Sequence, residues 1–450
     1  MGKYFGTDGF RGEVGVVLLP THAYELGRFF GWYTKEKQGR RPRCLIAMDT
    51  RISGGMLEGA LSAGLCASGA DAHLLGVAPT PALAYLVKAC GYDFGIMLSA
   101  SHNPFYDNGI KVFNENGEKP NAEFLSLAED HLDGKLECFG KRWDALPLMR
   151  GEEMGRVVSV PEKLDLYVEY LKAFGASVTK SLKIGLDCAN GATAAVAERL
   201  YRELGLDVVI MAKEPDGVNI NTACGSTHPE KLCAMVKELG LDLAFAFDGD
   251  GDRCLAVDEN GNMVDGDDIL YLLGKDLKAK GRLAHDTIVA TVMSNGGLAV
   301  SLARDGIGLV RTSVGDANVY AEMREKGYVL GGEQSGHIIL SDYATTGDGL
   351  LTSLAVLACV GTKPLSEAAG FPRFAQILVN VPLKRRGLMK DPVVAEAVSK
   401  LEARLGEGGR ILVRESGTEP LMRIMAECAD AALCEAVVAE AKTLLENAMA

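Results

Sequence analysis

Apolar runs of five to eight residues alternate with helical patterns along most of this chain. Three segments repeat one order: a strand, a helix, further strands, a polar loop and a returning strand. The copies begin at CLIAMDT, LKIGLDCANGA and DTIVATVMSNGG. This alternation predicts βαβ units and a largely parallel sheet in each copy.

Each copy places its most polar loop after the same strand. The loops are SHNP after DFGIMLSA, DGDGDR after LDLAFAF, and GEQSGH after GYVLGG. Ligands of parallel α/β sheets sit beyond the carboxyl ends of the strands. We therefore expect three equivalent loops from three equivalent domains to converge on one cleft.

The end of the chain follows a different pattern. After Lys363 and Pro364 come a strand, a helix, two strands and a long helix with an apolar face. This β-α-β-β-α order predicts a separate small α+β domain. The expected architecture is three similar mixed α/β domains in tandem and a C-terminal α+β domain, with the ranges 1–155, 156–257, 258–366 and 367–450.

Composition and charge narrow the class of protein. Of the 450 residues, 48% are hydrophobic and 24% are charged, which is typical of a folded chain and excludes wholesale disorder. Lys and Arg number 47 and Asp and Glu number 60, so the formal charge is −13, which argues against a general binder of nucleic acid or of anionic membranes. The 11 cysteines are scattered without metal-ligand or disulfide spacing, and no signal-peptide or membrane-span pattern is present. We expect a cytoplasmic protein without zinc or disulfides.

Three aspartates, Asp248, Asp250 and Asp252, alternate with glycine directly after an apolar strand. Crowded carboxylates repel one another, and a hard divalent cation such as Mg²⁺ relieves that repulsion. An EF-hand calcium loop is rejected because Arg253 stands where the EF-hand requires glycine and CLAVD is typical of a strand. The remaining alternative is a glycine-rich turn with solvated aspartates.

Ser101 and His102 end the third strand of the first copy, and Pro104 keeps the loop out of helical geometry. A serine beside a histidine is a candidate nucleophile or phosphate carrier. The alternative is a turn serine next to a structural histidine. Lys111, on the returning strand, places a cation near this loop.

Three further loops carry groups that suit small polar or anionic ligands. Arg414, Ser416, Gly417 and Thr418, with Arg423 beyond, combine free amides, hydroxyls and guanidinium groups that suit a phosphate, or else form a surface turn with an ion pair. Glu333 and Ser335 offer a carboxylate and a hydroxyl that suit sugar hydroxyls or an amine. Arg11 lies on a glycine-flanked turn near the N-terminus, where a role toward an anion and a solvated arginine are equally compatible with the pattern.

Together, Gly6–Gly12, Ser99–Pro104, Asp248–Arg253, Gly332–His337 and Arg414–Pro420 resemble the α-D-phosphohexomutase superfamily. The resemblance covers essentially the whole chain and all five loops in order. It implies four domains around a central cleft, the fourth similar to the TATA-box-binding protein. It also implies Mg²⁺ as cofactor and a small phosphosugar as substrate.

The resemblance implies a role for each loop. Ser101 is expected to be a phosphoserine that donates and recovers a phosphoryl group and shares Mg²⁺ with Asp248, Asp250 and Asp252. The expected substrate contacts are Arg253, Glu333, Ser335, Arg414, Ser416, Gly417, Thr418 and Arg423. His102, Lys111 and Arg11 are expected to move protons or stabilise charge near Ser101.

The wording GGEQSGH, GTDGFRG and SASHNP is most similar to bacterial members that act on glucosamine phosphate. This similarity implies interconversion of glucosamine 6-phosphate and glucosamine 1-phosphate through a sugar bisphosphate, in a possible homodimer. One departure is that Ala317, Asn318 and Val319 follow Asp316 where the family has Arg-Tyr-Val. The alternatives are a mutase for mannose or glucose phosphates, a phosphoserine-dependent sugar phosphatase and a non-catalytic sugar-phosphate sensor.

Overall fold

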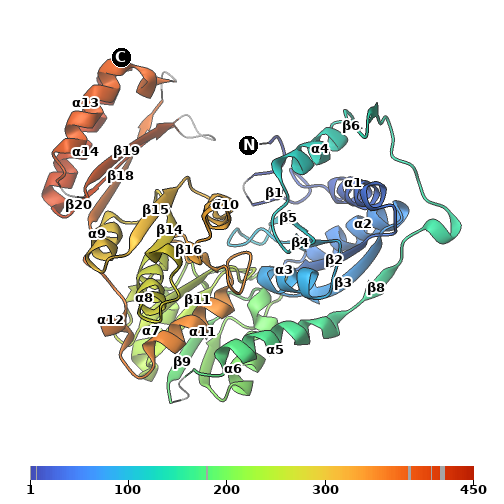
Figure 1. Cartoon of the computed structure of the whole chain (residues 1–450), viewed down its shortest axis with the longest axis horizontal. Coiled ribbons are helices and arrows are strands. Elements are labelled where there is room, and N and C mark those ends of the chain that lie inside the picture. The colour runs from blue at the N-terminus through green and yellow to red at the C-terminus, as the bar shows by residue number, and fades with distance from the viewer. Residues whose placement is uncertain are drawn as a thin grey trace.

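Four sheets of three or more strands follow one another along the chain (Figure 1). The computed structural model describes residues 2–6, 8–178, 181–383, 387–406, 408–415 and 421–449. Within those ranges no helix is both long enough and apolar enough to cross a bilayer.

The first sheet has the strand order β1-β5-β4-β2-β3-β8. Strands β2, β3, β4 and β8 run parallel, and β5 is antiparallel to its neighbours β4 and β1. Its strands are β1 (Phe10–Glu13), β2 (Arg43–Met48), β3 (Asp71–Val77), β4 (Phe94–Leu98), β5 (Asp107–Asn114) and β8 (Val157–Ser159). Its helices are α1 (Pro20–Gln38), α2 (Gly54–Ala67), α3 (Thr80–Ala89) and α4 (Ala122–Leu132), and a hairpin of β6 (Glu137–Cys138) and β7 (Lys141–Arg142) follows.

The second and third sheets have the orders β10-β9-β11-β12-β13 and β15-β14-β16-β17. The second contains β9 (Lys183–Asp187), β10 (Asp207–Met211), β11 (Leu243–Phe247), β12 (Cys254–Asp258) and β13 (Met263–Val264), with α5 (Leu164–Gly175), α6 (Ala197–Glu203) and α7 (Glu230–Leu239). The third contains β14 (Thr287–Thr291), β15 (Gly308–Thr312), β16 (Leu330–Gly332) and β17 (Ile338–Leu340), with α8 (Gly266–Ala279), α9 (Gly296–Arg304), α10 (Asp316–Lys326) and α11 (Gly349–Val360).

The three predicted copies have the same topology. The orders β3-β2-β4-β5, β10-β9-β11-β12 and β15-β14-β16-β17 each consist of three parallel strands followed by an antiparallel return. Strands β4 and β11 are buried at every position, as expected for strands covered on both faces. In each copy the polar loop joins the last parallel strand to the return, so the three loops occupy equivalent places.

Two strands lie a few residues beyond the ranges expected for their domains. β8 pairs with β3 in the first sheet although it follows residue 155, and β13 pairs with β12 in the second sheet although it follows residue 257. Both are short edge strands. The partner of β8 is distant in the sequence, and β13 reaches its partner through a turn. A pattern of apolar positions therefore does not reveal which sheet they join.

The C-terminal sheet is antiparallel, with the order β18-β20-β19. Exposed and partly buried positions alternate along β18, as in a sheet with one covered face. Its buried side chains form a core separate from the core that runs through the first three domains. The elements of this domain are β18 (Ala375–Pro382), α13 (Pro392–Ala403), β19 (Arg410–Glu415), β20 (Leu421–Cys428) and α14 (Ala431–Ala448), whereas the short helix α12 (Leu365–Ala368) precedes them and packs with Leu365 in the core of the preceding domains.

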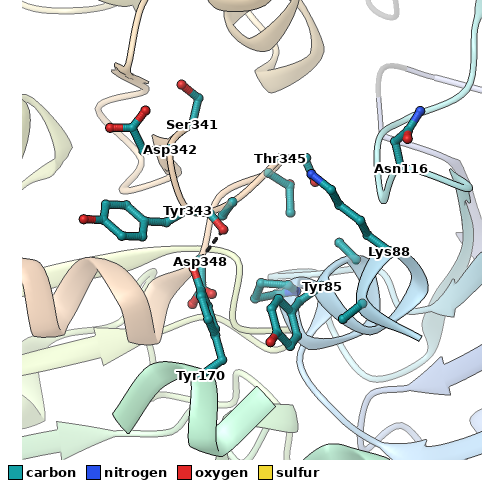
Figure 2. Close-up of a pocket in the computed structure, with 14 residues that line it drawn as sticks. Tyr85, Lys88, Asn116, Tyr170, Ser341, Asp342, Tyr343, Thr345 and Asp348 are labelled. Carbon is teal, nitrogen blue, oxygen red and sulfur yellow. Dashed lines mark hydrogen bonds between the residues drawn. The ribbon is translucent and has the colours of Figure 1, made fainter. Parts of the chain in front are cut away.

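The first three domains meet at a junction of tyrosines (Figure 2). The ring of Tyr85 on α3 stacks on Tyr170 of α5 with their centroids 4.4 Å apart, and the Tyr170 hydroxyl donates to the Tyr343 carbonyl at 2.8 Å. A cavity of about 270 Å³ lies at this junction, and neither Ser101 nor the three aspartates line it. The packing of these rings holds the segment after β17 against the other two domains.

Candidate active site

Ser101 lies at the end of β4, in the polar loop of the first domain. Its Oγ donates a hydrogen bond of 2.5 Å to Oδ2 of Asp248, which begins the polar loop of the second domain. Ser101 is 1% exposed and has a φ of 55°, a left-handed conformation that is uncommon for residues other than glycine. The first two loops therefore meet at this serine.

The approach of the two loops requires a glycine at position 249. A Cβ there would lie 2.5 Å from the Ser101 carbonyl oxygen, which is closer than side-chain carbons come to backbone oxygens. The glycines of DGDGDR thus do more than make the turn flexible. Gly249 lets the backbone that carries the serine lie directly against the backbone that carries the aspartates.

The carboxylates of Asp248, Asp250 and Asp252 are buried and gathered at one point. Each offers an oxygen within 4.8 Å of the others. Among the described residues, no hydrogen bond reaches Oδ1 of Asp250 or Oδ1 of Asp252. Burial, together with Asp252 and Asp250, raises the pKa of Asp248 well above its usual range. Buried, unsatisfied and mutually repelling oxygens fit a hard cation, because it supplies the missing charge.

Positive side chains surround the aspartates. Lys111 Nζ lies 2.6 Å from Asp250 and 3.2 Å from Asp252. Burial would lower the pKa of Lys111, but Asp250, Asp8 and Asp252 raise it, so the amine keeps its charge. Arg11 is held by an ion pair with Asp8. The structure thus brings two of the predicted cations into the same cluster as the metal-ligand candidates.

His102 lies beside the serine, with its Nδ1 3.3 Å from Ser101 Oγ. Burial, and then the charges of Arg253 and Arg11, lower the pKa of His102 to about 4. The imidazole is therefore neutral near pH 7. A neutral imidazole in this position is able to accept a proton from a hydroxyl.

The third loop sits on the second domain. Gly336, at φ 90°, packs with its backbone against Cys254, whose N–H donates to the Gly336 carbonyl at 3.0 Å. Oε1 of Glu333 accepts from the Gly315 N–H at 3.0 Å, and the Ser335 hydroxyl is buried without a hydrogen-bond partner in the described residues. Burial would lower the pKa of Arg253, but the negative charges of Asp248, Asp252 and Glu333 raise it. Arg253 thus faces the loops of both the second and the third domain.

The fourth predicted loop lies in the C-terminal domain. Arg414 on β19 and Arg423 on β20 are direct partners in the antiparallel register. Directly paired residues carry their side chains on the same face of a sheet, so both positive charges are available to one anion there. Ser416, Gly417 and Thr418, which the sequence predicts to bind phosphate, lie outside the described residues.

Two residues of the site were not predicted from the sequence. The buried Arg51 donates from Nη2 to the carbonyls of Ser101 and Asn103 at 2.8 and 2.9 Å. Nδ2 of Asn221, from the second domain, donates to the same two carbonyls at 2.9 and 3.1 Å. Arg51 is itself held by Asp49, 2.8 Å from its Nε. These contacts fix the left-handed turn at Ser101.

Replacing Arg51 by methionine should destabilise the protein by about 3–5 kcal/mol, because the Asp49 carboxylate would be left buried without its partner. Urea denaturation of the purified variant measures this loss. Arg202→Met, which breaks an exposed pair with Glu198, is the matched control and should change the free energy of unfolding by less than about 1 kcal/mol. Equal effects of the two substitutions would show that Arg51 does not hold the loop.

The four domains match known domain families in chain order. Residues 2–136, 165–261 and 265–374 match the phosphoglucomutase/phosphomannomutase alpha/beta/alpha domains I, II and III, and residues 378–444 match the C-terminal domain of the same family. A phosphoglucosamine mutase from Lachnoclostridium phytofermentans is 47% identical over 442 residues, which cover 97% of this chain and 96% of that protein.

Solved structures share the architecture. The crystal structure of a phosphoglucomutase/phosphomannomutase family protein from Burkholderia thailandensis has a TM-score of 0.79 and 26% identity, over 98% of this chain and 97% of that chain. An N-acetylphosphoglucosamine mutase from Aspergillus fumigatus, solved with GlcNAc-6P and magnesium, has a TM-score of 0.68 and 18% identity, over 99% and 96% of the two chains. With four consecutive domain matches and a relative nearly half identical along its length, the chain belongs to the phosphoglucomutase/phosphomannomutase family of phosphohexomutases.

Proposed function

We propose that this chain is a mutase that interconverts glucosamine 6-phosphate and glucosamine 1-phosphate. The reaction passes through a phosphoserine and a bisphosphorylated sugar. The relative that is 47% identical over 97% of the chain is named for this reaction. The observation that carries the chemistry is the 2.5 Å contact between Ser101 Oγ and Asp248, which brings a hydroxyl to the edge of a carboxylate cluster.

Ser101 is the phosphoryl carrier in this proposal. Its phosphate would complete the ligands that Asp248, Asp250 and Asp252 offer to one Mg²⁺ ion. When bound, the cation neutralises the charge on the transferring phosphoryl oxygens. The aspartates hold it there, and Lys111 keeps two of them oriented through its contacts with Asp250 and Asp252.

Each half of the reaction balances by itself. The phosphoserine P–O bond breaks, a bond forms between phosphorus and the free hydroxyl of the sugar monophosphate, and the hydroxyl proton passes to a nearby base. The serine oxygen that left in this first half takes up the hydroxyl proton. The bisphosphorylated sugar then reorients in the site, so that its other phosphate faces Ser101. In the second half Ser101 Oγ attacks the other phosphate, the P–O bond between that phosphate and the sugar breaks, and the serine proton passes to the departing sugar oxygen, which restores the phosphoserine. A sugar bisphosphate supplied from outside primes the unphosphorylated enzyme in the same way.

The neighbours of Ser101 divide the remaining tasks. The neutral imidazole of His102, 3.3 Å from Ser101 Oγ, accepts and returns a proton. Lys111 and Arg11 stabilise the negative charge around the phosphoryl group. Because Lys111 is held by buried contacts with the aspartates and Arg11 by its ion pair with Asp8, positioning contributes much of the rate.

The sugar is held from the opposite side. Glu333 and Ser335 bind its hydroxyl or amino groups, and Arg253 lies between this loop and the aspartates. Arg414 and Arg423 hold the phosphate that does not react, together with Ser416, Gly417 and Thr418. The register supports this assignment, because Arg414 and Arg423 are direct partners across β19 and β20, so both guanidinium groups lie on one face of the sheet, where one phosphate can bind both.

Comparing sugar phosphates tests the substrate. With catalytic sugar bisphosphate and Mg²⁺, kcat/KM for glucosamine 6-phosphate should exceed the values for glucose and mannose 6-phosphates by about tenfold or more, because a site built to pair an amine leaves buried groups unpaired with the other sugars. Intact mass and peptide mapping should place one phosphoryl group on Ser101. A higher kcat/KM for mannose or glucose phosphate would select the alternative mutases, and release of inorganic phosphate without isomerisation would select a phosphatase.

A further inference from the structure

A turn of the first domain accepts hydrogen bonds from the third domain. The β5 turn (residues 117–119) follows β5, and the carbonyl of Gly117 accepts a hydrogen bond of 2.5 Å from Thr345 Oγ1. The next residue, Glu118, accepts from the Tyr320 hydroxyl at 2.9 Å. The segment that carries Thr345 is held from its other side by Tyr170 (Figure 2). The β5 turn is therefore part of a fixed contact between domains.

Lys119 ends this turn and joins two carboxylates from different parts of the chain. Its Nζ lies 2.7 Å from Asp8 in the N-terminal loop and 2.5 Å from Asp316 at the start of α10. Asp8 in turn lies 3.1 Å from Lys111. The side chains of Lys119 and Asp316 are 23% and 13% exposed. The result is a line of alternating charges, from Asp316 through Lys119 and Asp8 to Lys111.

The two ends of this line reach two different parts of the active site. At one end, Lys111 contacts Asp250 at 2.6 Å. At the other end, Asp316 lies 3.5 Å from His337, and the residue before it, Gly315, donates to Glu333 at 3.0 Å. His337 and Glu333 bracket the sugar loop GEQSGH. Lys119 is thus the charged link between the sugar loop and the aspartate cluster.

We propose that Lys119 is a positioning residue that sets the distance and angle between the sugar loop and the phosphoryl carrier Ser101. The inference rests on the proposed function. Among the described residues, Lys119 forms ion pairs with Asp316 and Asp8, and it acts on the reacting groups through these two carboxylates. Phosphoryl transfer depends on alignment, and a displacement of about 1 Å lowers a rate by on the order of 100-fold.

The electrostatics support a link that persists in solution. Burial would lower the pKa of Lys119, but Asp8 and Asp316 raise it, so the amine stays charged. Burial would raise the pKa of Asp8, but Lys111, Lys119 and Arg11 hold it well below its usual range. An exposed ion pair contributes little to stability. The pair of Lys119 and Asp8 is mostly buried, and it also contacts the charges of Asp316, Lys111 and Arg11.

Lys119→Met tests the proposal, since it keeps the length of the side chain and removes the charge. The kcat/KM for glucosamine phosphate should fall by about 10- to 100-fold. Lys119→Arg keeps the charge and should remain within about fivefold of the wild type. Glu118→Gln is the matched control: it weakens a pair with Arg324 in the same interface but lies off the line of charges, so it should stay within about threefold.

A second measurement separates positioning from loss of structure. Because Ser101 and the aspartates keep their places in the proposal, loss of phosphate from phosphorylated Ser101 to water should change by less than about threefold in Lys119→Met. Asp316→Asn should reproduce the loss of transfer, and the double variant should be no worse than either single one.

Three results would overturn the inference: unchanged kcat/KM in Lys119→Met, an equal loss in Glu118→Gln, or hydrolysis that falls in step with transfer. A wild-type protein that does not isomerise glucosamine phosphate would contradict the proposed function instead. The two failures are therefore told apart by the wild-type rate.

Discussion

Replacing Ser101 by alanine should lower the rate of glucosamine phosphate interconversion by a factor on the order of 10⁴ or more. The substitution removes the oxygen that carries the phosphoryl group. The described hydroxyls nearby are already engaged, because Ser99 Oγ is held 2.6 Å from Asp49 and Thr80 Oγ1 donates to Asp250. Binding of the sugar phosphate should persist, because the groups proposed to hold it lie on other loops. Isothermal titration with glucosamine 6-phosphate and a coupled assay of product measure the two properties separately.

Two further variants serve as controls for the loss of activity in Ser101→Ala. Ser101→Gly also lacks the hydroxyl but suits φ 55° better than alanine, so it should be as inactive as Ser101→Ala while being at least as stable. Ser177→Ala, at an exposed serine, should leave the rate within about twofold, as surface substitutions usually do. Mutase activity that survives in Ser101→Ala would refute the assignment of Ser101 as the donor.

The sequence predicted the three copies because the information is local. A run such as LAFAF followed by DGDGDR marks a buried strand and the loop at its carboxyl end without reference to any other part of the chain. Once three copies share one order, topology alone places their loops at equivalent positions. The contact of Ser101 with Asp248 depends in addition on how the first two domains pack against each other, which the repeated order does not specify.

The remaining features depend on contacts between distant segments. Arg51 and Asn221 donate hydrogen bonds to the carbonyls of Ser101 and Asn103. Because every residue has a backbone carbonyl, the sequence does not indicate which carbonyls accept such bonds. The link through Lys119 joins residues 8, 119 and 316, each of which is typical of a solvated turn when taken alone. The neutrality of His102 is equally hidden, because burial and the charges of Arg253 and Arg11 lower its pKa. What could not be predicted is thus the set of groups that orient the predicted ones.

Removing the divalent cation with a chelator should lower the mutase rate by on the order of 1000-fold, and Mg²⁺ should restore it. The mutase rate of Asp248→Asn should stay low even after Mg²⁺ is added, because this variant should bind Mg²⁺ weakly. The pKa of Asp248 is raised by burial and by Asp252 and Asp250, so without a cation the charged form is disfavoured, and an amide imitates the neutral form. The variant should therefore fold as stably as the metal-free wild type.

Thermal unfolding distinguishes this explanation from simple damage to the fold. Mg²⁺ at about 100 times its Kd should stabilise the wild type by about 2.7 kcal/mol and should leave the Tm of Asp248→Asn unchanged. Since the raised pKa of Asp248 makes a proton compete with the cation for this carboxyl, the affinity of the wild type for Mg²⁺ should rise with pH. Asp144→Asn, at a carboxylate that is 91% exposed, should respond to Mg²⁺ as the wild type does. An equal rise in Tm for Asp248→Asn would place the cation elsewhere, because an amide cannot replace a carboxylate as a charged ligand without loss of affinity.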